Sequence, residues 1–245
     1  MKFNVDDWNK ADNAELARDH KISYQEILDA AKIFEQDSLA DNASWMWTRK
    51  FVDWKNLYNL SNNEVKRKII GFLNKGHCRL AKTDELAERI KLAHEQMTHF
   101  LAALENETLE DFDFQKEKEV EGKRFSNEEI LTNIFDCFSN IGYNFKGVAA
   151  SKLLSLINPN LFVMWDTPIC QAYGIRSPTE PYYRDKMYVP DFFHLMKRKA
   201  NDVIVSYIDE KKCSRNEAIE AINNLKKGRP LAKLLDEYNW VTNSK

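Results

Sequence analysis

Short serine–glutamate motifs precede four of the regular apolar patterns in this chain. In such a motif, the capping box, the serine hydroxyl accepts a hydrogen bond from the first turn of a helix and the glutamate reaches back to the serine. The four copies are Ser23–Glu26, Ser61–Glu64, Ser126–Glu129 and Ser214–Glu217. Apolar residues follow each copy at helical spacing, and a further such series from Leu86 to Leu104 predicts one more long helix. Because alternating strand patterns are scarce, we predict an all-α fold, a helical bundle.

An acidic stretch divides the helical pattern. Residues 105–129 are rich in acidic and polar side chains and contain Gly122, which predicts a connecting loop between helical regions. We therefore expect two helical subdomains, an N-terminal region over residues 1–110 and a second region over residues 123–245. A second interruption at residues 174–191 contains three of the six prolines, which predicts a long ordered loop of the kind that often carries function.

Composition and charge restrict the class of protein. The 245 residues include 36 Lys and Arg against 38 Asp and Glu, and 43% are apolar, which argues against an intrinsically disordered chain. From Lys146 to Lys245, however, 16 basic residues accompany 11 acidic ones. The densest basic clusters are Lys197-Arg198-Lys199 and Lys226-Lys227-Gly228-Arg229. They are candidates for a phosphate-binding face, and the alternative is that they are solvated helix ends.

Targeting and metal-binding signals are scarce. No apolar run approaches the ~20 residues of a membrane span, and the first seven residues hold no apolar signal core, so we expect a cytoplasmic protein without a membrane partner. The cysteines Cys78, Cys137, Cys170 and Cys213 form no close pair, and the five histidines do not cluster. We therefore expect reduced thiols, no metal site and no cofactor.

The most informative stretch is residues 126–173. A capped helix is predicted from about Asn127 to Ser139, and a glycine-containing turn follows it. A second helix then starts near Val148 and ends before Asn158-Pro159. After a short apolar segment, Asp166-Thr167-Pro168 is typical of a helix start, with Asp or Thr as the cap and Pro in the first turn.

The run Gly147-Val148-Ala149-Ala150-Ser151-Lys152, leading to Trp165-Asp166, resembles the helix-hairpin-helix DNA glycosylase superfamily and is most similar to the 8-oxoguanine DNA glycosylase-like proteins. The resemblance implies a helix-hairpin-helix element and excision of a damaged base, such as an oxidised purine, from double-stranded DNA. It implies Asp166 as the catalytic carboxylate and Lys152 as the amine that would add AP-lyase activity. The residues implied for binding of the DNA backbone are Gly142, Lys146, Gly147, Ala149 and Ser151.

The chemistry explains this choice of residues. Breaking an N-glycosidic bond builds positive charge on the sugar, which a nearby carboxylate stabilises. A lysine amine in a desolvated pocket can attack the sugar and form a Schiff base. The target base leaves the stack and is held by aromatic side chains. Candidates for this are Trp45, Trp47, Trp54, Tyr182, Tyr183 and Tyr188, although the three tryptophans fit a helical core better.

Two departures from the family pattern keep alternatives open. Ala149 stands where the family has its second hairpin glycine, and a count without a gap puts Ser151 on the usual lysine position. If the resemblance is set aside, the alternative is that Asp166 is only a helix cap and Lys152 an exposed helix lysine. The alternative functions are a non-catalytic helix-hairpin-helix DNA-binding protein and a helical protein-interaction module.

Overall fold

The computed structural model describes residues 12–37, 39–175, 188–226 and 228–243, and this part of the chain is mostly helical. Its longer helices are α1 (Asp12–Asp19), α2 (Tyr24–Asp37), α3 (Leu39–Lys50), α6 (Asp84–Gln96), α8 (Asn127–Ser139), α9 (Gly147–Ile157), α12 (His194–Lys211), α13 (Arg215–Asn224) and α14 (Leu231–Asn243). The shorter ones are α4 (Asn62–Glu64), α5 (Gly71–Lys75), α7 (Thr98–Ala103) and α10 (Thr167–Ala172). Short 3₁₀ helices span Leu57–Asn59 and Leu109–Asp111, and π-helical turns span Val65–Ile70 and Tyr188–Phe193. The all-α prediction is confirmed at this level.

All four predicted capping boxes form. Ser61, Ser126 and Ser214 each accept a hydrogen bond from the glutamate amide three residues on, and that glutamate accepts one from the serine backbone. Ser23 makes the same reciprocal pair with Glu26. The long helix predicted from Leu86 to Leu104 is instead two helices, because the chain leaves helical geometry at Met97 between α6 and α7.

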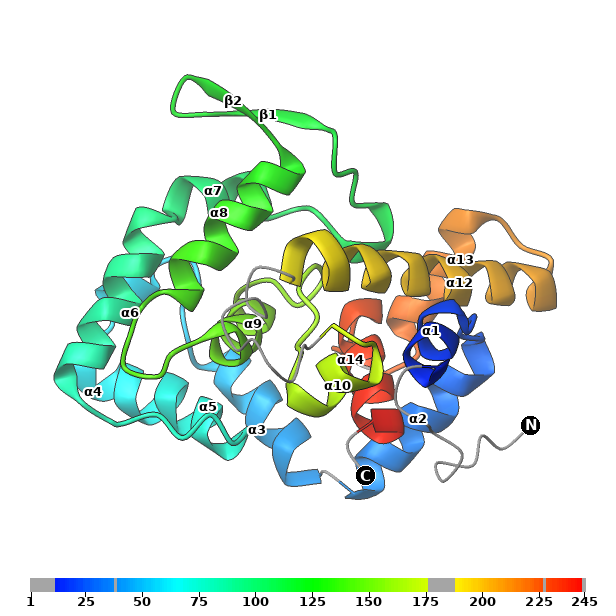
Figure 1. The fold of residues 1–245 in the computed structure, drawn as a ribbon, viewed down its shortest axis with the longest axis horizontal. Helices are drawn as coiled ribbons and strands as arrows, with labels where there is room; N and C mark the ends of the chain where they lie inside the picture. The colour runs from blue at the N-terminus through cyan, green and yellow to red at the C-terminus, as the bar shows by residue number, and fades with distance from the viewer. Residues whose placement is uncertain (1–11, 38, 176–187, 227, 244–245) are drawn as a thin grey trace.

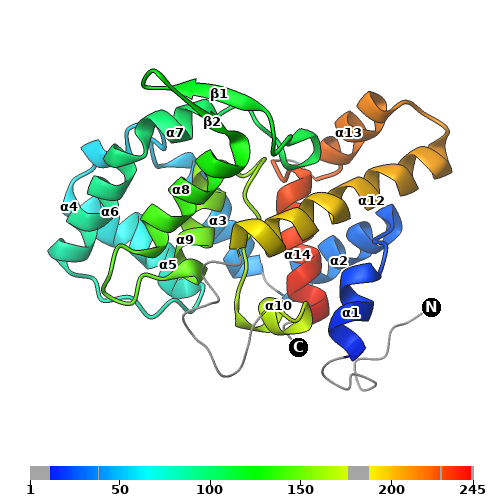
Figure 2. The same ribbon diagram turned by 45° about the horizontal axis from the view of Figure 1, so that its top comes forward.

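The helices gather into two groups with α3 and α10 between them (Figure 1). One group holds α4 to α9, and the other holds α1, α2, α12, α13 and α14, an arrangement that the turned view also shows (Figure 2). Helix α2 packs along α14, and α1 packs against α10. Helices from the predicted 1–110 region therefore contact helices from the predicted 123–245 region, and one hydrophobic cluster extends from Ile22 to Tyr238. The division into two subdomains stays a prediction.

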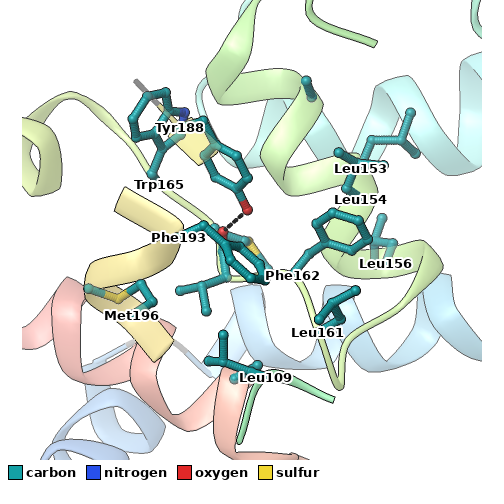
Figure 3. Packing of buried hydrophobic residues seen from close by; sticks show 14 of the residues in the cluster. Leu109, Leu153, Leu154, Leu156, Leu161, Phe162, Trp165, Tyr188, Phe193 and Met196 are labelled. Carbon is teal, nitrogen blue, oxygen red and sulfur yellow. Dashed lines mark hydrogen bonds between the residues drawn. The ribbon is translucent and has the colours of Figure 1, made fainter. Parts of the chain in front are cut away.

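The centre of the core lies where α9, the segment after it and the start of α12 meet (Figure 3). Trp165 and Tyr188 are both fully buried there, and the Tyr188 ring stacks on Phe135 with centroids 4.0 Å apart. The Tyr188 hydroxyl donates to the Val163 carbonyl at 2.8 Å. Tyr188 is thus a core residue and has no access to a base, contrary to its candidacy as a base-stacking residue.

The acidic stretch at residues 105–129 was expected to be a loop, and this expectation is wrong in part. Strands β1 (Glu117–Val120) and β2 (Lys123–Ser126) pair antiparallel, with Glu117 opposite Ser126. Glu121 and Gly122 connect them with positive φ angles of 51° and 76°, the geometry of a tight hairpin turn. Four of the eight strand residues are exposed and only Val120 is buried, so no apolar alternation marks the strands in the sequence.

No helix in the described ranges is both long enough and apolar enough to cross a membrane.

Candidate functional site

The connection between α8 and α9 is a tight turn fastened to α6. The Phe145 amide donates to the Gly142 carbonyl at 2.8 Å, and Tyr143 and Asn144 between them have φ angles of 53° and 64°. Arg89 of α6 donates to the Ile141 carbonyl at 3.2 Å, and its guanidinium lies 5.0 Å from the centre of the Tyr143 ring. These contacts fix the point at which α9 begins.

A buried serine joins α9 to the segment that leads into α10. Ser151 is fully buried, and its Oγ accepts a hydrogen bond from the Trp165 amide at 3.2 Å. Its hydroxyl lies 3.0 Å from the Val148 carbonyl and 3.3 Å from the Trp165 carbonyl. Because Lys152 and Asp166 are the next residues along each segment, this contact fixes their separation.

Asp166 and Lys152 both have a structural partner. Asp166 is the N-cap of α10, and its Oδ1 accepts a hydrogen bond from the Ile169 amide at 3.1 Å, while Pro168 lies in the first turn. The predicted helix start is therefore confirmed. Lys152 is half-buried, and its Nζ donates to the Gly76 carbonyl at 2.7 Å, in the connection between α5 and α6.

Both side chains line one cavity of about 500 Å³. Gly76 and His77 line the same cavity from the α5–α6 connection. Neighbouring Cys78 responds to both charges: burial raises the pKa of its thiol, the Lys152 ammonium lowers it and the Asp166 carboxylate raises it. The cavity thus places an amine, a carboxylate and apolar surface within reach of one bound molecule.

Helices α2, α3 and α14 form the opposite wall, which sequence reasoning missed. Lys233 and Asp236 of α14 both line the cavity, and Lys233 Nζ donates to Asp236 Oδ2 at 2.5 Å. The same ammonium lies 4.9 Å from the centre of the Phe34 ring and 5.6 Å from that of Trp45. The only local signal is the Lys–Asp spacing of three residues, which is common on exposed helices and does not indicate a site.

The five predicted backbone-binding residues divide into two sets. Gly142 and Lys146 are exposed, at the turn and at its end. Gly147, Ala149 and Ser151 are buried in the first turns of α9. The Ser151 hydroxyl is occupied by the Trp165 backbone, so this side chain has no access to a phosphate.

The cluster Lys197-Arg198-Lys199 faces inward more than outward. Lys199 is 1% exposed, and its Nζ donates to the Ala17 carbonyl at 2.8 Å and to the His20 carbonyl, so it caps the end of α1. Lys197 donates to the Glu110 carbonyl at 2.5 Å. Only Arg198 is exposed, so the expectation of a solvated or phosphate-binding cluster is wrong for its other two members.

The described residues of the second basic cluster, Lys226 and Arg229, also form ion pairs within the protein. Arg229 is buried between Glu237, at 2.9 Å, and Glu35, while Lys226 pairs with Glu35 at 2.8 Å. Lys227 lies outside the described residues. Buried charges require partners of opposite sign. Here the partners lie on different elements, so the ion pairs join α14 and the connection before it to α2.

The aromatic candidates differ in exposure. Trp45 is buried in the cavity wall, as a core tryptophan is expected to be, and Trp54 is half-buried with its Nε1 bonded to the Arg49 carbonyl at 3.1 Å. Trp47 is 47% exposed, so it is not the core residue we expected. Tyr182 and Tyr183 lie outside the described residues.

Comparisons of the chain with protein-family models, with curated proteins and with solved structures find no match.

Proposed function

We propose that this protein is a DNA N-glycosylase that removes a damaged base, with Asp166 as the catalytic carboxylate and Lys152 as a candidate nucleophile. The observation that carries the proposal is that both side chains line one cavity of about 500 Å³. This volume falls within the ~300–1,000 Å³ of typical small-molecule sites. A flipped nucleotide is a ligand of suitable size.

The reaction needs one bond to break and one to form. The N-glycosidic bond breaks, its electron pair leaves with the base, which takes up a proton, and positive charge develops at the sugar C1′. Asp166 would stabilise that charge or accept a proton from an attacking water. If Lys152 Nζ attacks instead, it forms a bond to C1′ as the base leaves; the C1′–O4′ bond then breaks, O4′ takes up a proton that the amine loses, and an imine remains between Lys152 and C1′.

The α5–α6 connection supplies the positive charge that a DNA backbone needs. Lys75 at the end of α5 and Arg79 and Lys82 in the connection are all exposed, and their side chains make no hydrogen bond or ion pair to a described residue. This connection runs beside the turn after α8 in both views (Figures 1 and 2). Because the predicted C-terminal clusters are largely internal, we propose that the DNA backbone passes over this connection.

The first experiment asks whether the protein releases a base. Duplexes carrying 8-oxoguanine, hypoxanthine or uracil are incubated with the protein and then cleaved with alkali at abasic sites. Asp166→Asn, prepared identically, controls for a contaminating glycosylase. Release by the wild type alone supports the proposal, whereas binding without release from any duplex favours the non-catalytic DNA-binding alternative.

The second experiment asks where DNA binds. Replacing Lys75, Arg79 and Lys82 with alanine should weaken binding about equally for all sequences and reduce the salt dependence by about one phosphate contact per lysine or arginine. Lys123→Ala with Arg124→Ala on the exposed hairpin is the matched control. If the wild type shows no salt-dependent DNA binding at all, the nucleic-acid function is wrong and the interaction-module alternative remains.

A further inference from the structure

The Lys152 amine is held by a backbone carbonyl and not by a carboxylate. Its Nζ donates to the Gly76 carbonyl at 2.7 Å and makes no ion pair with a described residue. Hydrogen bonds from a charged donor are stronger than those between neutral groups. Because the carbonyl accepts an N–H, it leaves the lone pair of the neutral amine free. The bond therefore fixes the place of the nitrogen without using the electrons that a nucleophile needs.

The backbone at residue 76 does not itself require a glycine. Gly76 has a φ of −78° and a ψ of 24°, and a negative φ of this size is open to residues with side chains. A β-carbon there, however, would lie 3.2 Å from Lys152 Nζ and 3.4 Å from its Cδ, with the Leu73 carbonyl also at 3.4 Å. Comfortable contacts between carbon atoms are about 3.5–4.0 Å. Any larger residue at this position therefore presses on the lysine.

The connection that carries this carbonyl is closed by its own hydrogen bonds. The Asn74 side chain accepts from the Leu80 amide at 2.6 Å and donates to the Leu80 carbonyl at 2.8 Å. Between these two residues, His77 and Arg79 have φ angles of 62° and 54°. Such a conformation is unfavourable for these residue types and persists only where surrounding contacts enforce it. The Gly76 carbonyl thus belongs to a loop with one enforced shape.

We propose that Gly76 is a positioning residue for Lys152: its carbonyl holds the amine at the cavity wall, and its missing side chain leaves the space that the amine occupies. The proposal rests on the proposed function only for the reaction of the amine, since attack on the sugar needs a nucleophile at a fixed place. The position itself is claimed for the free protein. The same segment carries Lys75, Arg79 and Lys82, so one short connection would place both the DNA backbone and the amine.

The first test is a double-mutant cycle on stability, which needs no DNA. Gly76→Ala should lower the melting temperature of the otherwise wild-type chain by about 2–4 °C, the shift expected when one hydrogen bond is lost in a chain of this length. Lys152→Ala removes both Nζ and Cδ, so Gly76→Ala should cause no decrease in that background. If Gly76→Ala alone does not fold, Lys152→Ala should restore folding.

Gly71→Ala is the matched control for this cycle. A β-carbon at Gly71 lies in ordinary contact, 3.7 Å from the Lys66 carbonyl. Its effect should therefore be the same with and without Lys152→Ala. A Gly76→Ala decrease of equal size in both backgrounds, or a fold that Lys152→Ala does not restore, overturns the proposal.

The second test compares two reactions of the same amine. Borohydride trapping on a damaged duplex requires the amine at one place, so Gly76→Ala should slow it by a factor on the order of 10². Formaldehyde with cyanoborohydride is a small reagent that approaches from any side, so methylation of Lys152, followed by peptide mass spectrometry, should not become slower. Lys75 in the same digest is the internal control. Trapping at the wild-type rate overturns the proposal, as does an equal decrease in both reactions.

The two proposals can fail separately. If the stability cycle gives the expected coupling but the wild type releases no base and traps no adduct, the glycosylase function is wrong and the placement of the amine by Gly76 stands. If the wild type releases a base and forms an adduct, and Gly76→Ala does both at the same rate, the positioning role is wrong and the glycosylase function stands.

Discussion

Replacing Asp166 by asparagine separates the observed capping of α10 from the proposed catalysis. Asparagine and aspartate are about equally good N-caps, so the hydrogen bond to the Ile169 amide, 3.1 Å in this structure, can be kept. What is lost is the negative charge at a helix N-terminus, worth about 0.3–1 kcal/mol. For a chain of this length that is a decrease in melting temperature of about 1–4 °C.

The effect on catalysis should be much larger. Removing one group that stabilises developing charge costs about 10²–10³ in rate, so Asp166→Asn should lower single-turnover base excision by that factor with DNA affinity retained. Asp166→Ala removes the cap as well and should cost a further ~1 kcal/mol of stability. Ser214→Ala is the matched control, because Ser214 caps α13 with the same kind of hydrogen bond and lies outside the cavity lining.

The assay measures excision per folded molecule, with the folded fraction followed by circular dichroism at the assay temperature. Ser214→Ala should be destabilised by ~1 kcal/mol and fully active. Excision by Asp166→Asn within about threefold of the wild type, a difference of ~0.7 kcal/mol, would show that the carboxylate is only a cap. A loss of activity that follows the unfolded fraction in both Asp166 and Ser214 variants would refute the reasoning in the same way.

Two further predictions concern lysines. If Lys152 is the nucleophile, borohydride added during reaction with damaged DNA should trap a covalent adduct that Lys152→Gln abolishes; excision without any trapped adduct means that water attacks and only Asp166 keeps its role. Burial lowers the pKa of Lys199 to about 8 in the folded protein. Above that pH the unfolded chain binds more protons than the folded one, so the free energy of unfolding should rise with pH. The expected rise is about 2 kcal/mol up to pH 9.5. Chemical denaturation at several pH values measures this rise, and Lys199→Met should reduce it, leaving the part due to Lys197, whose pKa burial also lowers. An unchanged rise in that variant contradicts the assignment.

Local signals in the sequence predicted the helix starts well. The Ser126 and Asp166 caps are contacts between residues three apart, so the residue types alone specify them. The same locality explains why α8, α9 and α10 appear in the predicted order with nearly the predicted bounds. The β1–β2 hairpin was missed because its strands hold only two apolar residues, Val120 and Phe125, and because Glu121-Gly122 is not one of the Asn-Gly or Asp-Gly pairs that mark a tight hairpin turn.

The site required information that no local pattern contains. Lys152 and Asp166, which the resemblance implies as catalytic residues, line one cavity. The other wall includes Phe34 of α2 and Lys233 of α14, which are far apart in the sequence and meet because α2 packs along α14. The inward orientation of Lys199 was equally invisible, since its partners are backbone carbonyls at the end of α1. A count of charges along the chain does not distinguish such a lysine from a solvated one.

The contact between Ser151 and Trp165 has a consequence for how this region moves. Both residues are fully buried, and the Trp165 amide is bonded to a side chain rather than to a helix or sheet. Its hydrogen therefore exchanges with solvent only when α9 separates from the segment that leads into α10. The exchange rate of this amide would therefore measure how often α9 and this segment separate, which is the motion that changes the spacing of Lys152 and Asp166. A slow rate would mean that the two side chains keep their spacing before a substrate binds.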